Sequence, residues 1–367
     1  MLKSCATLVA VLGGALSGCG TGEAPLPPPN VTVKAGESIQ AAIDAMPMGA
    51  TSWVVAVEPG VYKQTLSVIR ANVELRGLAT APGFDATKRP ILDGDNDPAN
   101  KDAIQGYGAN FTIRGLAVRN YAGNGIVVKK TQNVKMIDLD IDKTGAYGLY
   151  PVEMDGVLVE ACRVTGAADA GIYVGQSTNA TVRNNRVSQN VTGIEIENTV
   201  GAVVELNEAT DNTAGLLAFV LPNNPSKVGK DCVFRRNKSY NNNHANFAAP
   251  NATVAKVPVG LGVFIMAADS TTVTDNDIYG NDSAGVLLVG LGQLLKDTSM
   301  LDVDPNPDNT VIRDNRFMGN GTKPAKDIAD SFGGKGADVA WDLTDKKFCA
   351  NEKEGTLFLP TAPNACP

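Results

Sequence analysis

The sequence is poor in histidine, in aromatic residues and in positive charge. Only one of its 367 residues is histidine (His244), and Phe, Trp and Tyr together make up 5%. A single histidine argues against metal sites built from several histidines and against catalytic triads centred on histidine. The net charge of −7 argues against nucleic acid or an anionic membrane surface as a partner, because both are bound by basic patches.

Beyond the N-terminus, no apolar run approaches the ~20 residues that a membrane-spanning helix needs. The first twenty residues combine Lys3, an apolar stretch over 6–16 and the sequence Leu-Ser-Gly-Cys ending at Cys19. A charged start, a short apolar stretch and small residues at a cleavage site are typical of a secretory signal.

The Leu-Ser-Gly-Cys ending resembles the bacterial lipoprotein box. The resemblance implies that residues 1–18 are a lipoprotein signal peptide and that Cys19 carries the lipid. The proline-rich residues 19–30 then form a semi-rigid tether. This places the protein in the bacterial cell envelope, touching the membrane through the lipid anchor only. Gly20 stands where retention signals of this family usually have Asp, which favours the outer membrane.

An internal repeat organises most of the remaining chain. Two columns of asparagine recur at steps of 22 to 39 residues, and a column of glycine follows them, each glycine opening a β-rich segment. The asparagine columns are Asn185, Asn207, Asn237, Asn276 and Asn315, and then Asn190, Asn212, Asn242, Asn281 and Asn320. Asparagine and glycine tolerate left-handed backbone geometry, so the repeat predicts short strands separated by tight bends at fixed places.

A period near 22 residues with three short strands resembles the right-handed parallel β-helix, the pectin-lyase-like fold. The closest likeness is to bacterial parallel β-helix repeat lipoproteins. The segment 38–45 is similar to the amphipathic helix that caps the first coil of such proteins. The resemblance implies an all-β solenoid of about ten coils over residues 31–345, with an N-terminal cap helix and a C-terminal tail over 346–367.

Four cysteines lie beyond Cys19. Cys349 and Cys366 both lie near the chain end and could close a small loop, which the oxidising envelope permits. Cys162 and Cys232 fall in inward-facing columns three coils apart, too far for a disulfide. We therefore expect both to be buried.

Outward columns on the first two strands of each coil alternate in charge, as in Glu160, Arg183 and Glu205, and we interpret them as stabilising ladders. The third strand is different. Its outward columns contain Tyr150, Tyr173, Glu195 and Glu197 and then become apolar: Leu217, Phe219, Phe264 and Met266.

Long insertions lie beside that apolar patch, over 220–230, 241–261 and 290–308. An exposed apolar patch needs a cover or a partner. Either the insertions fold back over it, or they form a cleft in which apolar loops meet the two tyrosines and the two glutamates.

Several residues are candidates for chemistry or binding. Glu195 and Glu197 point to the same side of one strand and could act as acid and base on a glycosidic bond. His244 titrates near neutrality and is a further catalytic candidate. Tyr150 and Tyr173, with Lys129 in the neighbouring outward column, are candidate sugar-binding residues. The Asp triad with Gly-His-Gly of polygalacturonases and the Asp-Pro-His-Asp of mannuronan epimerases are both missing.

Calcium is the one cofactor that the sequence suggests. Asp302, Asp304, Asn306 and Asp308 place oxygen-bearing side chains at alternate positions. Hard cations such as calcium prefer oxygen ligands, although the Gly and Glu that complete an EF-hand loop are absent.

The function we expect is that of an envelope-anchored lipoprotein that binds extended polysaccharide along its third-strand face without catalysis. One alternative is a polysaccharide lyase or glycoside hydrolase that uses Glu195 or Glu197. The other is a structural scaffold that holds an envelope protein against the apolar patch.

Overall fold

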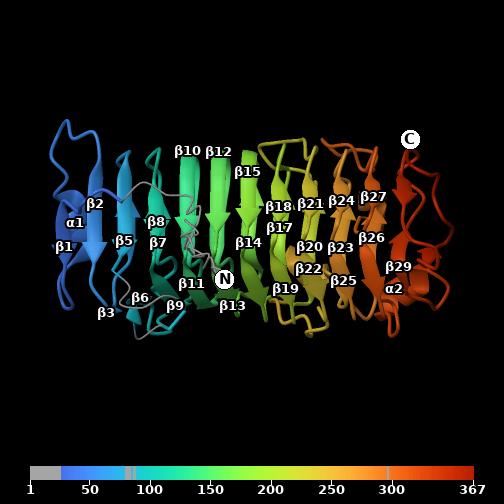
Figure 1. Ribbon diagram of the computed structural model, residues 1–367, viewed down its shortest axis with the longest axis horizontal. Helices are drawn as coiled ribbons and strands as arrows, with labels where there is room; N and C mark the ends of the chain where they lie inside the picture. The colour runs from blue at the N-terminus through green and yellow to red at the C-terminus, as the bar shows by residue number, and fades with distance from the viewer. Residues whose placement is uncertain (1–25, 79–83, 86–87, 296) are drawn as a thin grey trace, which may run out of the picture.

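The computed structural model describes residues 26–78, 84–85, 88–295 and 297–367, so the signal peptide and Cys19 lie outside the described residues. The chain winds into a rod in which successive coils lie side by side from the N-terminal end to the C-terminal end (Figure 1). All pairings between the named strands are parallel, and each coil contributes one strand to each of three stacks. This arrangement is the right-handed parallel β-helix that the repeat predicts.

The first stack pairs short strands through most of the rod. It consists of β1 (Val31–Val33), β2 (Trp53–Val57), β5 (Val73–Gly77), β8 (Thr112–Arg114), the second halves of β10 (Ile126–Ile137) and β12 (Leu149–Glu160), β15 (Thr178–Arg183), β18 (Val203–Glu205), β21 (Val233–Arg235), β24 (Thr272–Thr274), β27 (Val311–Arg313) and β30 (Cys349–Asn351).

The second stack forms a separate sheet. It consists of β3 (Gly60–Tyr62), β6 (Pro90–Asp93), β9 (Ala117–Tyr121), β11 (Asp140–Thr144), β13 (Arg163–Thr165), β16 (Arg186–Ser188), β19 (Glu208–Thr210), β22 (Lys238–Tyr240), β25 (Asp277–Tyr279) and β28 (Arg316–Met318).

The third stack carries the face that the sequence singled out. It consists of β4 (Leu66–Val68), β7 (Ile104–Gly106), the first halves of β10 and β12, β14 (Ala170–Gly175), β17 (Thr192–Glu197), β20 (Ala214–Phe219), β23 (Leu261–Met266), β26 (Ala284–Val289), β29 (Ala337–Trp341) and β31 (Phe358–Leu359).

Side chains that point inward form one continuous apolar core, because strands alternate their side chains between the two faces of a sheet. The column Ile172, Ile194, Leu216 and Val263 is fully buried and lies in register from β14 to β23. Cys162 and Cys232 are free and buried in this core, as predicted.

The two asparagine columns form buried ladders at the bends. The side-chain amide of each asparagine donates to the side-chain oxygen of the equivalent asparagine one coil further on, as from Asn207 to Asn237 at 3.0 Å. The same amide also donates to a backbone carbonyl, here Val182 at 2.9 Å. Carboxylates accept at the C-terminal ends of the ladders: Glu352 from Asn315 and Asp338 from Asn320.

Helices are short and lie at the ends and edges of the rod. The cap helix α1 (Ile39–Asp44) begins after Ser38, whose hydroxyl accepts a hydrogen bond from the backbone of Ala41, and it buries Ile39 and Ile43 against the first coil. The other helices with described bounds are the 3₁₀ turns η2 (Thr253–Lys256) and η3 (Leu291–Gln293) and the helix α2 (Lys326–Ser331). None of the helices in the described residues is long and apolar enough to cross a membrane.

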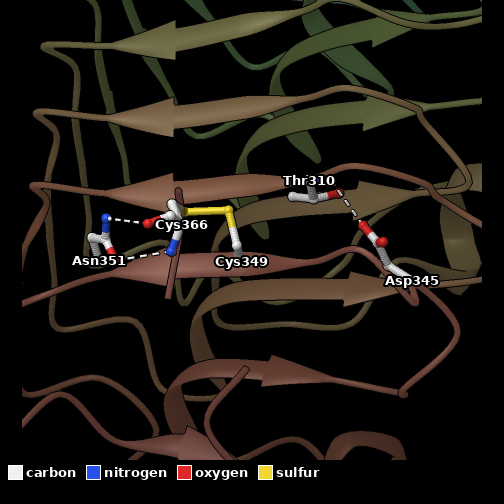
Figure 2. Close-up of a disulfide and its surroundings, with 5 residues drawn as sticks. All are labelled: Thr310, Asp345, Cys349, Asn351 and Cys366. Carbon is white, nitrogen blue, oxygen red and sulfur yellow. Dashed lines mark hydrogen bonds between the residues drawn. A yellow bond between two sulfur atoms is a disulfide. The ribbon is translucent and has the colours of Figure 1, made fainter. Parts of the chain in front are cut away.

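A disulfide between Cys349 and Cys366 joins β30 to the end of the chain (Figure 2). The Asn351 side chain lies beside it and accepts a hydrogen bond from the backbone of Cys366 at 3.0 Å. One bend earlier, the backbone of Thr310 donates to the buried carboxylate of Asp345 at 2.9 Å. These contacts hold the C-terminal segment against the last coil.

Candidate active site

The outward face of the third stack has the register that the repeat predicts. Tyr173 pairs with Glu195 and Glu195 with Leu217, while Glu197 pairs with Phe219 one column away. Each outward side chain therefore has a neighbour about 4.8 Å away on the next coil. The outward residues change from polar to apolar between β17 and β20. These two strands lie near the middle of the rod (Figure 1).

The insertions both fold back over the apolar patch and form a cleft, so the two alternatives of the sequence analysis occur together. The insertions cover the apolar half, since Leu217, Phe219, Phe264 and Met266 are at most 6% exposed. They also leave a cleft with a cavity volume of about 190 Å³. Its walls come from β17, β20, β23 and β26, from η2 and η3, and from α2, a helix that the sequence analysis did not predict.

Three carboxyl groups lie at one end of this cleft: Asp169, Glu195 and Glu197. The Glu197 carboxylate is fixed by donors from three directions: Tyr173 Oη at 2.9 Å, Gln176 Nε2 at 3.2 Å and Asn224 Nδ2 at 2.8 Å. Asn224 belongs to the insertion 220–230, so this contact also ties that loop to the face.

Glu195 and Asp169 have fewer partners. The hydroxyl of Thr192 donates to Glu195 Oε2 at 3.0 Å, and the Tyr147 hydroxyl donates to Asp169. The two glutamates also share a hydrogen bond, which raises the pKa of Glu195 and lowers that of Glu197. Burial nevertheless leaves the pKa of both glutamates above the usual range, that of Glu195 the more strongly.

Burial raises the pKa of all three carboxyl groups, because the charged form loses hydration. The pKa of Glu195 lies well above its usual range, and repulsion from Asp169 and Glu197 adds to the effect of burial. The pKa of Asp169 rises to about 7, first through burial and then through the charge of Glu197. The cluster therefore contains a group that exchanges its proton near neutral pH.

No lysine or arginine in the described part of the chain forms an ion pair with these three carboxyl groups. Lys256 lines the same cleft, at the end of η2, and Asp327 of α2 lines it too. The cleft is thus rich in acidic groups and poor in positive charge.

Three tyrosines cluster next to the carboxyl groups. The ring centroids of Tyr147, Tyr150 and Tyr173 lie 4.4 to 5.0 Å apart. Tyr147 lines the cleft itself, whereas Tyr173 is buried behind it and donates to Glu197. Tyr150 is half-buried beside them and does not line the cleft, so of the three rings only Tyr147 borders the cavity.

The structure does not bring His244 and Lys129 to this cleft. His244 lies in the insertion 241–261, with Nδ1 2.9 Å from the Ala245 carbonyl and its ring against Phe247. Neither it nor Lys129, on β10, is among the residues that line the cavity. A loop position and an outward column fix only the face on which a residue lies, so the sequence did not place either residue relative to the cleft. Their catalytic and binding roles stay predictions.

The four oxygen-bearing residues of the segment 302–308 are not gathered into a centre. Asp302 pairs with Lys227, Asp304 accepts from the backbone of Asn306, and Asp308 pairs with Lys347 at 2.9 Å. Within the described ranges, no group of three or more His, Cys, Asp or Glu side chains is placed to hold a metal ion. Calcium binding by this segment stays a prediction.

Sequence reasoning missed Asp169 and Tyr147, although a signal for both was present. Asp169 lies two residues before Gly171 of the glycine column, and the equivalent positions in the other coils are Gly123, Ala146, Val191, Thr213, Gly260 and Ser283. None of these residues is charged, so the equivalent residues of the neighbouring coils cannot form an ion pair with Asp169. A carboxyl group without such a stabilising neighbour is a candidate for a functional role. Tyr147 is likewise the one aromatic residue of the next column along the chain.

Comparisons with known proteins agree with this architecture. The family described as "Right handed beta helix region" matches residues 124–296. The structure is similar to the A-module of the mannuronan C-5 epimerase AlgE4 from Azotobacter vinelandii, with a TM-score of 0.62 and 16% identity over 92% of this chain and 99% of that one. It is also similar to polygalacturonase from Erwinia carotovora ssp. carotovora, with a TM-score of 0.60 and 12% identity over 95% of this chain and 99% of that one.

No curated protein sequence matches the chain at a significant level. Identities of 12% and 16% show a shared fold and leave the chemistry of each site to its own residues. On the strand pairing and on these likenesses, the chain is a right-handed parallel β-helix with the pectin-lyase-like fold.

Proposed function

We propose that the cleft hydrolyses glycosidic bonds by acid–base catalysis, with Asp169 and Glu197 as the two carboxyl groups. The observation that carries this proposal is that three carboxyl groups, the buried Glu195 and Glu197 and the partly buried Asp169, lie together at one end of a cleft without a paired cation among the described residues. Such a cluster costs stability, since charged groups are removed from water and repel one another. Clusters of this kind are favoured where they perform chemistry.

The different surroundings of Asp169 and Glu197 suit them to different roles, proton donor and ionised carboxylate. Asp169, with its pKa near 7, can hold a proton at neutral pH and donate it to the oxygen of the bond that breaks. Glu197 is the acceptor for three fixed donors, which favour its ionised form. An ionised carboxylate there can accept a proton from attacking water or stabilise positive charge on the sugar.

The reaction balances with water as the only co-reactant. The bond between the sugar carbon and the linking oxygen breaks, and that oxygen takes the proton of Asp169. Hydroxide from water bonds to the sugar carbon, and the remaining proton of that water returns the pair of carboxyl groups to its starting state. In this scheme Glu195, whose pKa burial raises well above its usual range, keeps its own proton and takes no part in the transfer.

Two features favour a saccharide as the substrate. Tyr147 lines the cleft next to the carboxyl groups, and tyrosine rings are among the side chains on which sugar rings pack. Mannuronan epimerase and polygalacturonase, to which the fold is similar, are named for polysaccharide substrates.

Hydrolysis is favoured over the lyase reaction by the charge of the cleft. Elimination by a lyase requires a sugar carboxylate beside the proton that is removed, and that anion needs a cationic partner. Here Asp169, Glu197 and Asp327 face a single lysine, Lys256, among the described residues that line the cleft. We therefore propose neutral glycans as the substrates.

The test is incubation of the folded body with neutral and acidic glycans, followed by mass spectrometry of retained and shortened chains. We expect new reducing ends from neutral glycans, and their loss in Asp169→Asn and Glu197→Gln. His244→Ala, outside the cleft, is the matched control and should keep full activity. Retention of intact glycan by the wild type would instead support binding without catalysis. A lack of both products and retention would favour the scaffold alternative.

A further inference from the structure

The cleft has two chemically different ends. Asp169 and the two glutamates form one end, whereas the remainder is a largely apolar chamber. Phe219, Phe264 and Met266 form its floor on β20 and β23, and Val257, Ile328 and Phe332 close it from the insertions and from α2. The proposed hydrolysis by Asp169 and Glu197 uses only the acidic end.

An unsubstituted sugar ring does not suit this chamber. Its hydroxyl groups would lose their hydrogen bonds to water against aromatic and aliphatic walls, and each buried polar group without a partner is costly. An apolar group, in contrast, gains free energy from the same burial.

The volume of the cavity sets the size of that group. An apolar cavity of about 150 Å³ takes up one benzene molecule. The cavity here is of similar size, about 190 Å³, and part of it faces the carboxyl groups. The enclosed volume therefore has room for about one short acyl group or one aromatic ring, and not for several sugar units.

The register places this chamber next to the proposed chemistry. Glu197 pairs with Phe219 on the next coil, and Phe219 packs edge-on against Phe264 with ring centroids 4.8 Å apart. Phe219 lies one strand from Glu197 and Phe264 lies two strands away, so a group held by these two rings lies within about two strand spacings, about 10 Å, of β17.

We infer that the substrate is a saccharide with an apolar substituent on the reacting unit, and that this substituent occupies the chamber formed by Phe219, Phe264 and Phe332. This inference rests on the proposed function, because the same cleft holds both parts of the ligand. Acyl esters on a glycan and aryl groups at a chain end share the required chemistry.

The experiment compares matched pairs of ligands on the wild-type protein. One pair is a methyl glycoside and the 4-nitrophenyl glycoside of the same sugar, and the other is an O-acetylated neutral polysaccharide before and after alkaline deacetylation. Binding is measured by calorimetry on the Asp169→Asn variant, which removes turnover, and kcat/KM is measured on the wild type. We expect the substituted member of at least one pair to be favoured about tenfold or more. The pair that shows the preference identifies the source of the substituent.

Phe332→Ala opens the chamber at a half-buried position, so we expect the preference to fall below about threefold. Phe247→Ala removes an exposed phenylalanine outside the cleft and should leave the preference unchanged. Val257→Phe, which fills the chamber from the insertion, should abolish the preference and provides a second variant if Phe332→Ala unfolds.

Equal affinity and equal kcat/KM within both pairs would overturn the inference and leave the proposed hydrolysis standing. Preference for the unsubstituted member would overturn it as well. If no saccharide were bound or cleaved, both the inference and the proposed function would fail, so the two failures are distinguishable.

Discussion

At the scale of single residues, the carboxyl group of Asp169 is the most unusual feature of the molecule. It is partly buried beside Glu197 and forms no ion pair among the described residues, whereas other acids of the fold pair with arginines, such as Asp140 with Arg163 at 2.7 Å and Glu160 with Arg183 at 2.8 Å. Each of those pairs stabilises the contact between neighbouring coils by about 0.2–1 kcal/mol. Asp169 has no arginine partner of this kind, so its charged form should lower the free energy of unfolding. That loss of stability can be measured and would support a catalytic role.

The first prediction concerns how this cost depends on pH. The Asp169 carboxyl group has its ordinary pKa of 3.8 in the unfolded chain and a pKa of about 7 in the folded protein. Between these values the folded state binds more protons, so the free energy of unfolding falls as pH rises through this window and levels off above it. Asp169→Asn should therefore gain about 4 kcal/mol relative to the wild type at pH 8 and little at pH 4.

Urea unfolding of both proteins at the two pH values measures this difference, with Asp211→Asn as a control at an exposed position. If Asp169→Asn changed the free energy of unfolding equally at pH 4 and pH 8, the pKa of the Asp169 carboxyl group would not be raised in the folded protein.

Sequence reasoning found part of the site at this scale. Glu195 and Glu197 were predictable because strand alternation fixes the side on which a side chain lies. Asp169 was not identified because it lies at a bend, where alternation gives no direction. Its raised pKa depends on the insertions that exclude water, and the paths of those insertions are not encoded in the repeat.

At the scale of structural elements, the asparagine ladders hold the bends of successive coils in register. Asn237 is 1% exposed and accepts from the backbone and side-chain amides of Asn207, both at 3.0 Å. It donates in turn to Val204 at 2.9 Å and to Asn276 at 3.0 Å. The ladder therefore satisfies backbone groups that the bend would otherwise leave buried without partners.

The second prediction is that Asn237→Ala lowers the free energy of unfolding by about 2–4 kcal/mol, because it leaves several buried polar groups without partners. Asn251→Ala, at an exposed position in the insertion 241–261, removes the same side chain without breaking a ladder. Chemical denaturation of the two variants measures the difference. Similar stabilities would mean that the ladder side chains contribute little beyond filling space.

The strands and ladders could be predicted because the repeat records them once per coil. The helix α2 could not, since its six residues, Lys-Asp-Ile-Ala-Asp-Ser, contain one large apolar side chain and show no helical periodicity. Its position over the cleft depends on packing between Ile328 and the covered face. For this reason the sequence could not decide whether the insertions cover the apolar patch or form a cleft beside it.

At the scale of the whole molecule, the protein is a rod in which each coil contacts mainly its neighbours. The ends need separate protection, because an open strand edge can pair with another chain. The helix α1 covers the first coil, and the segment that carries Cys366 covers the last (Figure 1). Both features follow from the sequence, since the cap helix and the two late cysteines lie outside the repeat.

The third prediction is that loss of the disulfide acts locally. Closing a loop between residues 17 positions apart contributes about 3 kcal/mol in the chain-entropy estimate. In a solenoid, this loss should be confined to the terminal coils. Hydrogen exchange of a Cys366→Ser variant should show faster exchange in β30 and β31 and unchanged exchange in β14 and β17. Faster exchange along the whole rod would contradict this local role and indicate that the rod unfolds as one unit.

The central claim is that Asp169 and Glu197 together break glycosidic bonds, and the pH dependence of kcat/KM on a neutral glycan tests it most directly. We predict that kcat/KM measured by release of reducing ends falls tenfold per pH unit above about 7, as Asp169 loses its proton. Asp169→Asn should lose at least about 100-fold in activity and this limb of the profile. A profile that stays flat from pH 6 to pH 9, or full activity in Asp169→Asn, would contradict the account.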